Sequence, residues 1–199
     1  MDCGEFSLAE VCGIDEAGRG PLSGPVCAAA VVLPEDFPLG CLDDSKALSE
    51  LKRGKAYDLI VAGALDWAVA WATHEEIGAF NILNASLLAM SRAYSLIQRK
   101  TRIVLVDGDR LPPISDPCHA IVRGDSMIPS IMAASILAKV ARDRLMTRLD
   151  GIEPEYSFPR HKGYPTKSHL EAIKKNGPSL WARPGFRSSG LTESQSLRS

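Results

Sequence analysis

The sequence predicts an α/β fold with a mixed five-stranded sheet, flanked by helices, and a small C-terminal helical segment. Two observations support this fold class. Short apolar segments alternate with longer segments that carry apolar residues at helical spacing. The first two apolar segments are joined by a glycine-rich loop, which is typical of a hairpin, whereas residues 102–107 are almost wholly apolar and follow a helix, which is typical of a buried parallel strand.

The first part of the chain is expected to form a hairpin, a helix and a third strand. The hairpin strands are residues 11–14 and 25–33, joined by the loop GRGPLSG. Ser49 can cap a helix at residues 49–64, because its side chain can accept from the backbone N–H groups of the first turn. Residues 66–73, DWAVAWAT, alternate well enough to predict the third strand.

The second part continues with alternating helices and strands. Residues 81–100 carry apolar side chains at helical spacing, residues 102–107 form the buried strand, and residues 118–122 form a further strand. Pro129 suits the first turn of a long helix at residues 130–149, where its missing N–H costs nothing. A loop at residues 151–166 leads to a short helix at residues 167–175.

The length and composition predict one globular domain. The chain has 199 residues, of which 45% are hydrophobic and 24% charged, ordinary values for a soluble protein with a single core. No linker separates a second domain. We expect the domain at residues 1–150, the helical segment packed on it at residues 151–187, and a disordered, serine-rich tail at residues 188–199.

Cysteine usage and the N-terminal sequence predict a cytoplasmic location. None of the five cysteines forms a C-x-x-C pair. Because five is an odd number, disulfide pairing would leave one cysteine unpaired, so we expect reduced thiols. Cys27 has the surroundings of a small core residue. The N-terminus MDCGEFSLAE lacks the basic and apolar pattern of a signal peptide, and no run of about 18 apolar residues is present.

Charge is distributed unevenly along the chain. The net charge is −1, but residues 1–50 hold ten acids and two bases, whereas residues 139–187 hold eleven bases and five acids. An acidic pocket facing a basic surface suits a cation-dependent enzyme that acts on a polyanion. Two ordinary solvated faces would produce the same split, so charge alone leaves both interpretations open.

Four acidic residues follow hydrophobic runs, namely Asp15, Glu16, Asp107 and Asp125. Any one of them would most simply be a turn residue or a helix cap. Since sites in open α/β sheets gather at the carboxyl ends of strands, however, the four side chains can share one pocket. Clustered carboxylates repel one another unless a cation neutralises them. Oxygen ligands favour Mg²⁺ or Mn²⁺, and the absence of C-x-x-C and H-E-x-x-H argues against zinc.

The loop that follows Glu16 has no standard nucleotide-binding pattern. Pro21 interrupts the helix entry that a dinucleotide-binding loop requires, and the G-K-[ST] of a phosphate-binding loop is absent. Its glycines let backbone amides approach a ligand closely, and Arg19 can bind a phosphate. A tight turn without a ligand would also use these glycines.

Five separated blocks resemble bacterial ribonuclease HII, the type 2 ribonuclease H, in order and approximate spacing. The blocks are GIDEAGRGPLSGPV, DDSKALS, VDG, GD followed by SIMAASILAKVARDR, and HKGYPT. They cover roughly residues 10–175. The resemblance implies a ribonuclease H-like sheet with an added C-terminal helical segment. It also implies an endonuclease that hydrolyses the RNA strand of RNA–DNA hybrids and cuts 5′ of single ribonucleotides in duplex DNA, leaving 3′-hydroxyl and 5′-phosphate ends.

The resemblance assigns roles to individual residues. The family's catalytic, metal-binding acids match Asp15, Glu16, Asp107 and Asp125, which implies two-metal-ion hydrolysis with Mg²⁺ or Mn²⁺. The loop that recognises the ribose 2′-hydroxyl matches Gly18, Arg19 and Gly20. The tyrosine that packs on the next sugar matches Tyr164, although a buried structural tyrosine would fit the residues alone.

Further residues are candidates for substrate binding. Lys46 lies in DDSKALS, and Ser135, Lys139 and Arg142 fall on one face of the long helix, where they can contact phosphates or form a solvated stripe. The chain departs from the family after Pro178, where LWARPGF replaces the usual His-Arg-x-Ser-Phe-like ending, although Arg183 and Phe186 keep part of that pattern. The departure concerns a C-terminal contact with DNA.

Three alternatives remain at this point. Ribonuclease HIII shares the fold but favours stretches of RNA, and its relatives usually carry an additional N-terminal domain. A non-catalytic binder of hybrid duplexes would use the acids as a structural Ca²⁺ site, although such a site draws its ligands from one local segment. An integrase-type nuclease lacks the GRG loop and the HKGYP segment. The expected partners are RNA–DNA hybrids and DNA duplexes that contain ribonucleotides, bound by a monomer away from any membrane.

Overall fold

The sheet is mixed, with its strands in the order β3-β2-β1-β4-β5. The computed structural model describes residues 6–42 and 48–185. The strands are β1 (Val11–Ala17), β2 (Val26–Val32), β3 (Asp66–Ala72), β4 (Ile103–Asp107) and β5 (Cys118–Ile121). Strand β2 is antiparallel to both β1 and β3, whereas β1 runs parallel to β4 and β4 parallel to β5. The predicted fold class and the order of the elements are confirmed.

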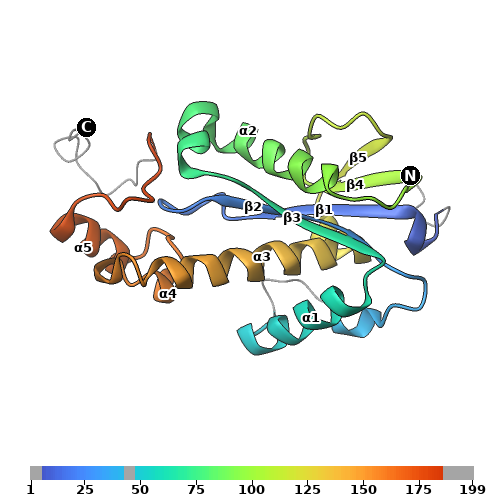
Figure 1. Cartoon of the computed structure of the whole chain (residues 1–199), viewed down its shortest axis with the longest axis horizontal. Coiled ribbons are helices and arrows are strands. Elements are labelled where there is room, and N and C mark those ends of the chain that lie inside the picture. Colours follow the sequence, from blue (N-terminus) through green and yellow to red (C-terminus); the bar gives the residue numbers. More distant parts are fainter. Residues whose placement is uncertain (1–5, 43–47, 186–199) are drawn as a thin grey trace.

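Helices cover both faces of the sheet (Figure 1). One face packs on α2 (His74–Ser95), and the opposite face packs on α3 (Pro129–Leu149) and α1 (Glu50–Gly63). Strand β2 is buried throughout and divides its side chains between the two layers. Ala28 and Ala30 lie in the α2 layer, whereas Cys27 and Ala29 lie in the α3 layer, as the two-residue period of a strand requires.

The long helix α3 lies very close to β1. A Cβ added to Gly13 would lie 2.2 Å from the carbonyl carbon of Ser130, so only glycine fits beneath the start of the helix. Ala133 and Ala134 are fully buried against the sheet and have small side chains, which permits the same close approach farther along. This packing places Ser135, one residue farther on, where its side chain hydrogen-bonds to Asp15 near the end of β1.

The C-terminal segment contains more helix than predicted. The expected loop at residues 151–166 includes the short helices η5 (Pro154–Tyr156) and α4 (Phe158–His161), and α5 (Lys167–Asn176) follows at the predicted place. Tyr156 and Phe158 are buried and join Met146 of α3 in one apolar cluster, so the segment is packed on the end of α3. Ser23 then pairs with Ala182 in an isolated β-bridge.

The prediction for α2 was wrong at both ends. The helix begins at His74, where Thr73 and Glu76 form a capping box, and it ends at Ser95. Asn81 lies inside it with φ 65° and ψ 167°, which breaks the regular helix. The apolar spacing that begins at Ile82 therefore reports only the part of the helix that follows the break.

Two other expectations concern the chain as a whole. Cys12, Cys27, Cys41 and Cys118 are free thiols, and Cys27 is fully buried in the core. Within residues 6–42 and 48–185, no helix combines the length and the apolar character that crossing a membrane requires. The predicted tail at residues 188–199 lies outside the described residues.

Candidate metal centre and substrate loop

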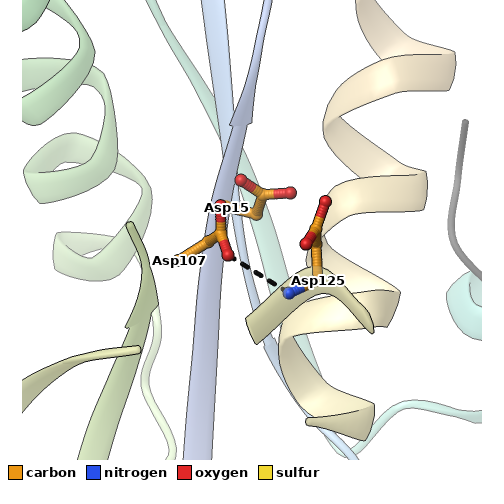
Figure 2. Close-up of side chains that lie close together, drawn as sticks. All are labelled: Asp15, Asp107 and Asp125. Atoms are coloured by element: carbon orange, nitrogen blue, oxygen red, sulfur yellow. Dashed lines mark hydrogen bonds between the residues drawn. The ribbon is translucent and has the colours of Figure 1, made fainter. Parts of the chain in front are cut away.

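Three aspartates from separate elements meet at one edge of the sheet (Figure 2). Asp15 lies near the end of β1, Asp107 is the last residue of β4, and Asp125 lies in the short helix η4 (Gly124–Ser126) that precedes α3. Because β1 and β4 are parallel, with Ile14 opposite Val106, the two aspartates that follow are neighbours. Each contributes a carboxylate oxygen within 4.8 Å of the other two.

Local backbone geometry brings Asp125 to the pair. Its N–H donates a hydrogen bond to Oδ1 of Asp107 over 3.2 Å. Arg123 adopts a left-handed conformation with φ 61°, which turns the chain from β5 into η4. A Cβ on Gly124 would lie 2.5 Å from Cδ1 of Ile131, so glycine lets this turn press against α3.

The Asp15 carboxyl is held in a setting that disfavours its charge. Burial raises its pKa well above the usual range, and the carboxyls of Glu16 and Asp107 raise it further. Hydrogen bonds from the Ser135 side chain and from the Glu16 N–H, which lies 2.6 Å from Oδ1, oppose that shift. Without a cation, the site therefore disfavours the charged form of the Asp15 carboxyl.

Glu16 lies beside the three aspartates but outside their cluster. Adjacent residues of a strand point to opposite faces of the sheet, so Glu16 and Asp15 diverge. The Glu16 carboxylate lies 3.4 Å from Nη1 of Arg19. Burial raises the pKa of Glu16, Arg19 lowers it, and Asp107 raises it, which places the carboxylate within electrostatic reach of the cluster.

The donor set of the cluster suits a hard divalent cation. All three ligand atoms are carboxylate oxygens, and two of the side chains are buried. Mg²⁺ and Mn²⁺ prefer such ligands, whereas zinc prefers histidine and cysteine, of which this cluster has none among the described residues. The residues therefore fit the metal that the sequence predicts.

The glycine loop lies against Tyr164. Gly18 has φ +102°, and a Cβ there would lie 2.0 Å from Nε of Arg142, so both the conformation and the space require glycine. A Cβ on Gly20 would lie 3.5 Å from Cε1 of Tyr164, which places the tyrosine ring next to the loop. The N–H of Leu22 donates to the carbonyl of Gly163 over 2.8 Å and joins the two segments.

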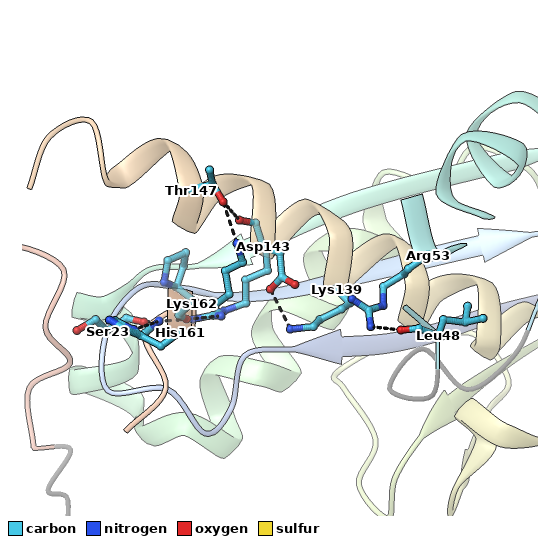
Figure 3. Close-up of polar contacts among 11 residues, drawn as sticks. Ser23, Leu48, Arg53, Lys139, Asp143, Thr147, His161 and Lys162 are labelled. Carbon is cyan, nitrogen blue, oxygen red and sulfur yellow. Dashed lines mark hydrogen bonds and ion pairs between the residues drawn. The ribbon is translucent and has the colours of Figure 1, made fainter. Parts of the chain in front are cut away.

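The residues predicted to contact phosphates occupy different environments. Ser135 is buried and hydrogen-bonded to Asp15. Lys139 forms an ion pair with Asp143 over 2.9 Å (Figure 3). Its Nζ lies 5.7 Å from the centre of the Tyr164 ring. Arg142 is only 1% exposed. Lys46 and Phe186 lie outside the described residues.

Arg142 contacts the protein backbone rather than solvent. It donates to the carbonyls of Pro25, Lys162 and Ser23 over 3.0, 2.9 and 3.1 Å. The helical spacing correctly predicted that Ser135, Lys139 and Arg142 share a face, but it could not indicate that Arg142 is covered by the C-terminal segment. Its guanidinium is therefore placed to hold the chain around the loop.

Two features of the C-terminal segment were not predicted. Arg183 is 3% exposed and donates to carbonyls of the glycine loop. His161 and His169 stack with ring centres 4.3 Å apart, and each bonds the backbone beside Tyr164. No local pattern marks either feature, because an arginine next to a proline and two separated histidines have no characteristic spacing.

The chain is similar to known ribonucleases over most of its length. A family model described as ribonuclease HII matches residues 12–189. Ribonuclease HII of Dechloromonas aromatica is 53% identical over 176 residues, which are 88% of this chain and 90% of the relative. Ribonuclease HII of Burkholderia thailandensis is 51% identical over 176 residues, which are 88% of this chain and 82% of the relative.

Solved structures agree with this similarity. The ribonuclease H2 of Pyrococcus horikoshii OT3 superposes with a TM-score of 0.70 at 27% identity, covering 87% of this chain and 92% of that one. A mutant protein of Bst-RNase HIII superposes with a TM-score of 0.70 at 18% identity, covering 87% of this chain and 65% of that one, and shows the shared fold alone. From its matched residues and its relatives, the chain belongs to the ribonuclease HII family.

Proposed function

We propose that this ribonuclease cleaves the RNA strand of RNA–DNA hybrids and also cuts 5′ of single ribonucleotides embedded in duplex DNA, leaving 3′-hydroxyl and 5′-phosphate ends. The observation that carries the proposal is the meeting of Asp15, Asp107 and Asp125 near a loop that packs on Tyr164. The three aspartates suit a phosphodiester backbone held by cations, and the loop with Tyr164 suits a ribose.

The cofactor we propose is Mg²⁺ or Mn²⁺, held by Asp15, Asp107 and Asp125. Ions of this class activate water and stabilise the leaving oxygen during an in-line displacement at phosphorus. The chain prepares the site in two ways. The Ser135 hydroxyl orients Asp15, and the backbone of Asp125 orients Asp107. Glu16 can complete the donor set by leaving Arg19, since its ion pair at 3.4 Å is partly exposed and weak.

Selectivity for RNA is proposed to come from the loop Gly18-Arg19-Gly20. A 2′-hydroxyl is both a donor and an acceptor, so a backbone amide that faces the substrate can bind it and reject deoxyribose. The N–H groups of Arg19 and Gly20 donate to no acceptor within residues 6–42 and 48–185. Tyr164 is 37% exposed beside Gly20 and offers its ring to the next sugar.

Affinity is proposed to come from basic residues around the site. Arg19 is half exposed at the loop, and Lys139 lies between Asp143 and Tyr164, where a phosphate can displace the carboxylate. Lys46 is a further candidate from the sequence. Binding through phosphates should weaken as salt rises, because bound counterions are released on association.

The acting form we propose is a monomer in the cytoplasm. The three aspartates, the glycine loop and Tyr164 all come from one chain, so a second copy is not needed to complete the site. The free thiols of Cys12, Cys27, Cys41 and Cys118 suit a reducing compartment.

Two alternatives are treated differently by the comparisons. A non-catalytic hybrid binder with a structural cation site was one interpretation of the sequence, and membership in a ribonuclease family overturns it. Ribonuclease HIII has the same fold, but the family model and the relatives at 51–53% identity are ribonuclease HII. Cutting at single ribonucleotides in duplex DNA, in addition to RNA–DNA hybrids, is therefore the finer part of the proposal.

One cleavage assay tests the function. End-labelled duplexes that contain one ribonucleotide, a run of ribonucleotides or none are incubated with Mg²⁺ or Mn²⁺, and the products are separated beside size markers. We expect a single cut 5′ of the lone ribonucleotide and no cut in DNA. Cleavage confined to the long run would indicate ribonuclease HIII-like selectivity, and cleavage of neither RNA-containing duplex would overturn the proposal.

A further inference from the structure

We propose that Arg183, in the C-terminal segment, is a positioning residue that turns the backbone amides of the Gly18–Gly20 loop toward the substrate. The inference rests on the proposed recognition of the 2′-hydroxyl by this loop. The C-terminal segment would then contribute to sugar specificity by shaping the loop. The sequence had indicated only a DNA contact that departs from the family pattern.

Arg183 binds both limbs of the loop at once. Its Nη2 donates to the Gly18 carbonyl over 2.6 Å, and Nη1 donates to the Arg19 carbonyl over 3.0 Å. On the returning limb, Nε donates to the Gly24 carbonyl over 2.7 Å and Nη2 to the Pro25 carbonyl over 3.2 Å. The guanidinium therefore lies between the limbs and acts as a cross-brace.

The direction of these bonds determines where the amides point. In a planar trans peptide, the N–H points away from the C=O of the same unit. The Gly18 carbonyl and the Arg19 N–H belong to one unit, and the Arg19 carbonyl and the Gly20 N–H belong to the next. Because Arg183 holds both carbonyls on the inner side, the two N–H groups face the opposite side. Two adjacent donors are thereby presented together.

The brace is buried, so its bonds are difficult to replace by water. Burial lowers the pKa of Arg183 to about 9, and the nearby Arg142 contributes to the shift. Hydrogen bonds from a charged donor are short and strong, and four of them offset the loss of hydration. The Arg183 N–H also donates to the Leu22 carbonyl over 2.9 Å, which fixes its own backbone to the loop.

Arg142 is a second brace, on the side of Tyr164. Its bonds to Ser23 and Pro25 hold the returning limb, and its bond to the Lys162 carbonyl holds the segment that carries Tyr164. The two arginines thus set the loop and the tyrosine relative to each other. A lysine at either position could not do the same, because its single ammonium lacks the planar fork needed to bind carbonyls on separate limbs.

The test is Arg183→Lys, which keeps the charge and removes the fork. We measure kcat and KM on a duplex with one ribonucleotide, and cleavage of the same duplex carrying a 2′-fluoro sugar at that position. The expected result is a loss in kcat/KM of about tenfold to a hundredfold, as misplacement of a binding group by about 1 Å produces. Discrimination between the two sugars should fall as well, while the Mn²⁺ concentration for half-maximal rate stays unchanged.

Arg160→Lys is the matched control, since Arg160 is an exposed arginine of the same segment, and it should match the wild type. If Arg183→Lys fails to fold, the same assays on Arg183→Gln and Arg142→Lys decide the question. A folded variant that keeps wild-type discrimination would overturn the inference and leave the proposed function intact. A wild-type enzyme that does not distinguish the two sugars would overturn the proposed recognition of the 2′-hydroxyl, and the inference with it.

Discussion

The backbone N–H of Asp125 donates to Oδ1 of Asp107 over 3.2 Å, so one member of the aspartate cluster orients another. The bond fixes the direction in which the Asp107 carboxylate faces the other two acids. It also ties η4, which leads into α3, to the end of β4. The position of the helix and the position of the acid are therefore coupled.

Asp107→Asn should abolish cleavage and preserve binding. Asparagine keeps the size and one acceptor oxygen, so the bond from Asp125 can persist, but it removes the charge that a divalent cation requires. We expect a loss in rate of about a thousandfold or more under saturating substrate, with duplex affinity in Ca²⁺ changed by less than about threefold. Gel-based cleavage and fluorescence anisotropy measure the two quantities.

Asp109→Asn is the control for that variant. Asp109 lies two residues farther along the same turn, and its exposed side chain is 4.0 Å from Arg110. It should cleave at the wild-type rate. Near-normal turnover by Asp107→Asn, or equal losses in both variants, would contradict the assigned metal site.

Asp15→Asn should stabilise the protein in the absence of metal while it abolishes activity. Burial, together with Glu16 and Asp107, raises the folded-state pKa of Asp15 above its unfolded value. The folded state then holds the proton more tightly, so stability is present at low pH and is lost as pH rises from the unfolded pKa through the folded one. At pH 7 the variant avoids that loss, because asparagine carries no charge.

Thermal unfolding in EDTA measures the Asp15 effect. We expect the melting temperature of Asp15→Asn to exceed that of the wild type at pH 7, by about 2–4 °C for each kcal/mol gained in a chain of this size. The difference should shrink as pH is lowered toward 4. Added Mg²⁺ or Mn²⁺ should stabilise the wild type and leave the variant nearly unchanged. A lower melting temperature for the variant at pH 7 would contradict the electrostatic account.

Gly18→Ala should damage the loop and leave the aspartates in place. The residue has φ +102°, which an L side chain rarely adopts, and its Cβ would meet the Arg142 guanidinium at 2.0 Å. We expect a fall of about tenfold or more in kcat/KM on the single-ribonucleotide duplex, with metal dependence retained. Gly40→Ala is the control, because a Cβ there meets no atom within 4 Å. Equal activity of the two variants would argue against a shaped loop.

The sequence predicts the framework better than the details of the site. The order of the elements and most strand positions followed from apolar runs and turn residues, because those patterns record burial directly. The end of the first strand was wrong, since β1 continues past Ile14 to Ala17. The start of α2 was missed, since Asn81 breaks the apolar spacing, although the Thr73–Glu76 capping box marks it. A capping pattern is thus the better signal where a helix is interrupted.

Relations across the chain could not be predicted from local patterns. The separation of Glu16 from the three aspartates depends on which face of β1 each residue takes at the strand end. The burial of Arg142 depends on a segment twenty residues away, whose Lys162 carbonyl it binds. From the sequence alone, an arginine on a helix face that binds phosphate cannot be told from one that another segment of the chain covers.

The stacked pair His161 and His169 should make the protein sensitive to acid. The Gly163 N–H donates to Nδ1 of His161, so the proton of that ring is on Nε2, which donates to the Tyr156 carbonyl. His169 donates from Nδ1 to the Tyr164 carbonyl, and its Nε2 faces the Ser23 hydroxyl at 3.5 Å. The hydrogen bond from Gly163 holds the His161 ring neutral, and burial lowers the pKa of both rings.

Burial lowers the pKa of His169 to about 4, and a charge on His161 would lower it further, whereas the Tyr164 carbonyl opposes the shift. Since the unfolded chain takes up its proton near pH 6.5, the folded state holds fewer protons between about 6.5 and 4. Stability is then present above pH 6.5 and is lost as pH falls through that window, by at most about 1.4 kcal/mol per pH unit for one histidine.

His169→Asn should flatten this dependence, because the asparagine amide can still donate to the Tyr164 carbonyl but does not titrate. Urea unfolding at pH 7.5, 6, 5 and 4.5 measures the free energy of unfolding at each pH. The variant should be less stable at pH 7.5, because it loses ring packing against Phe158 and His161, and should lose less stability toward pH 4.5. Parallel curves for the two proteins would show that another group controls acid unfolding.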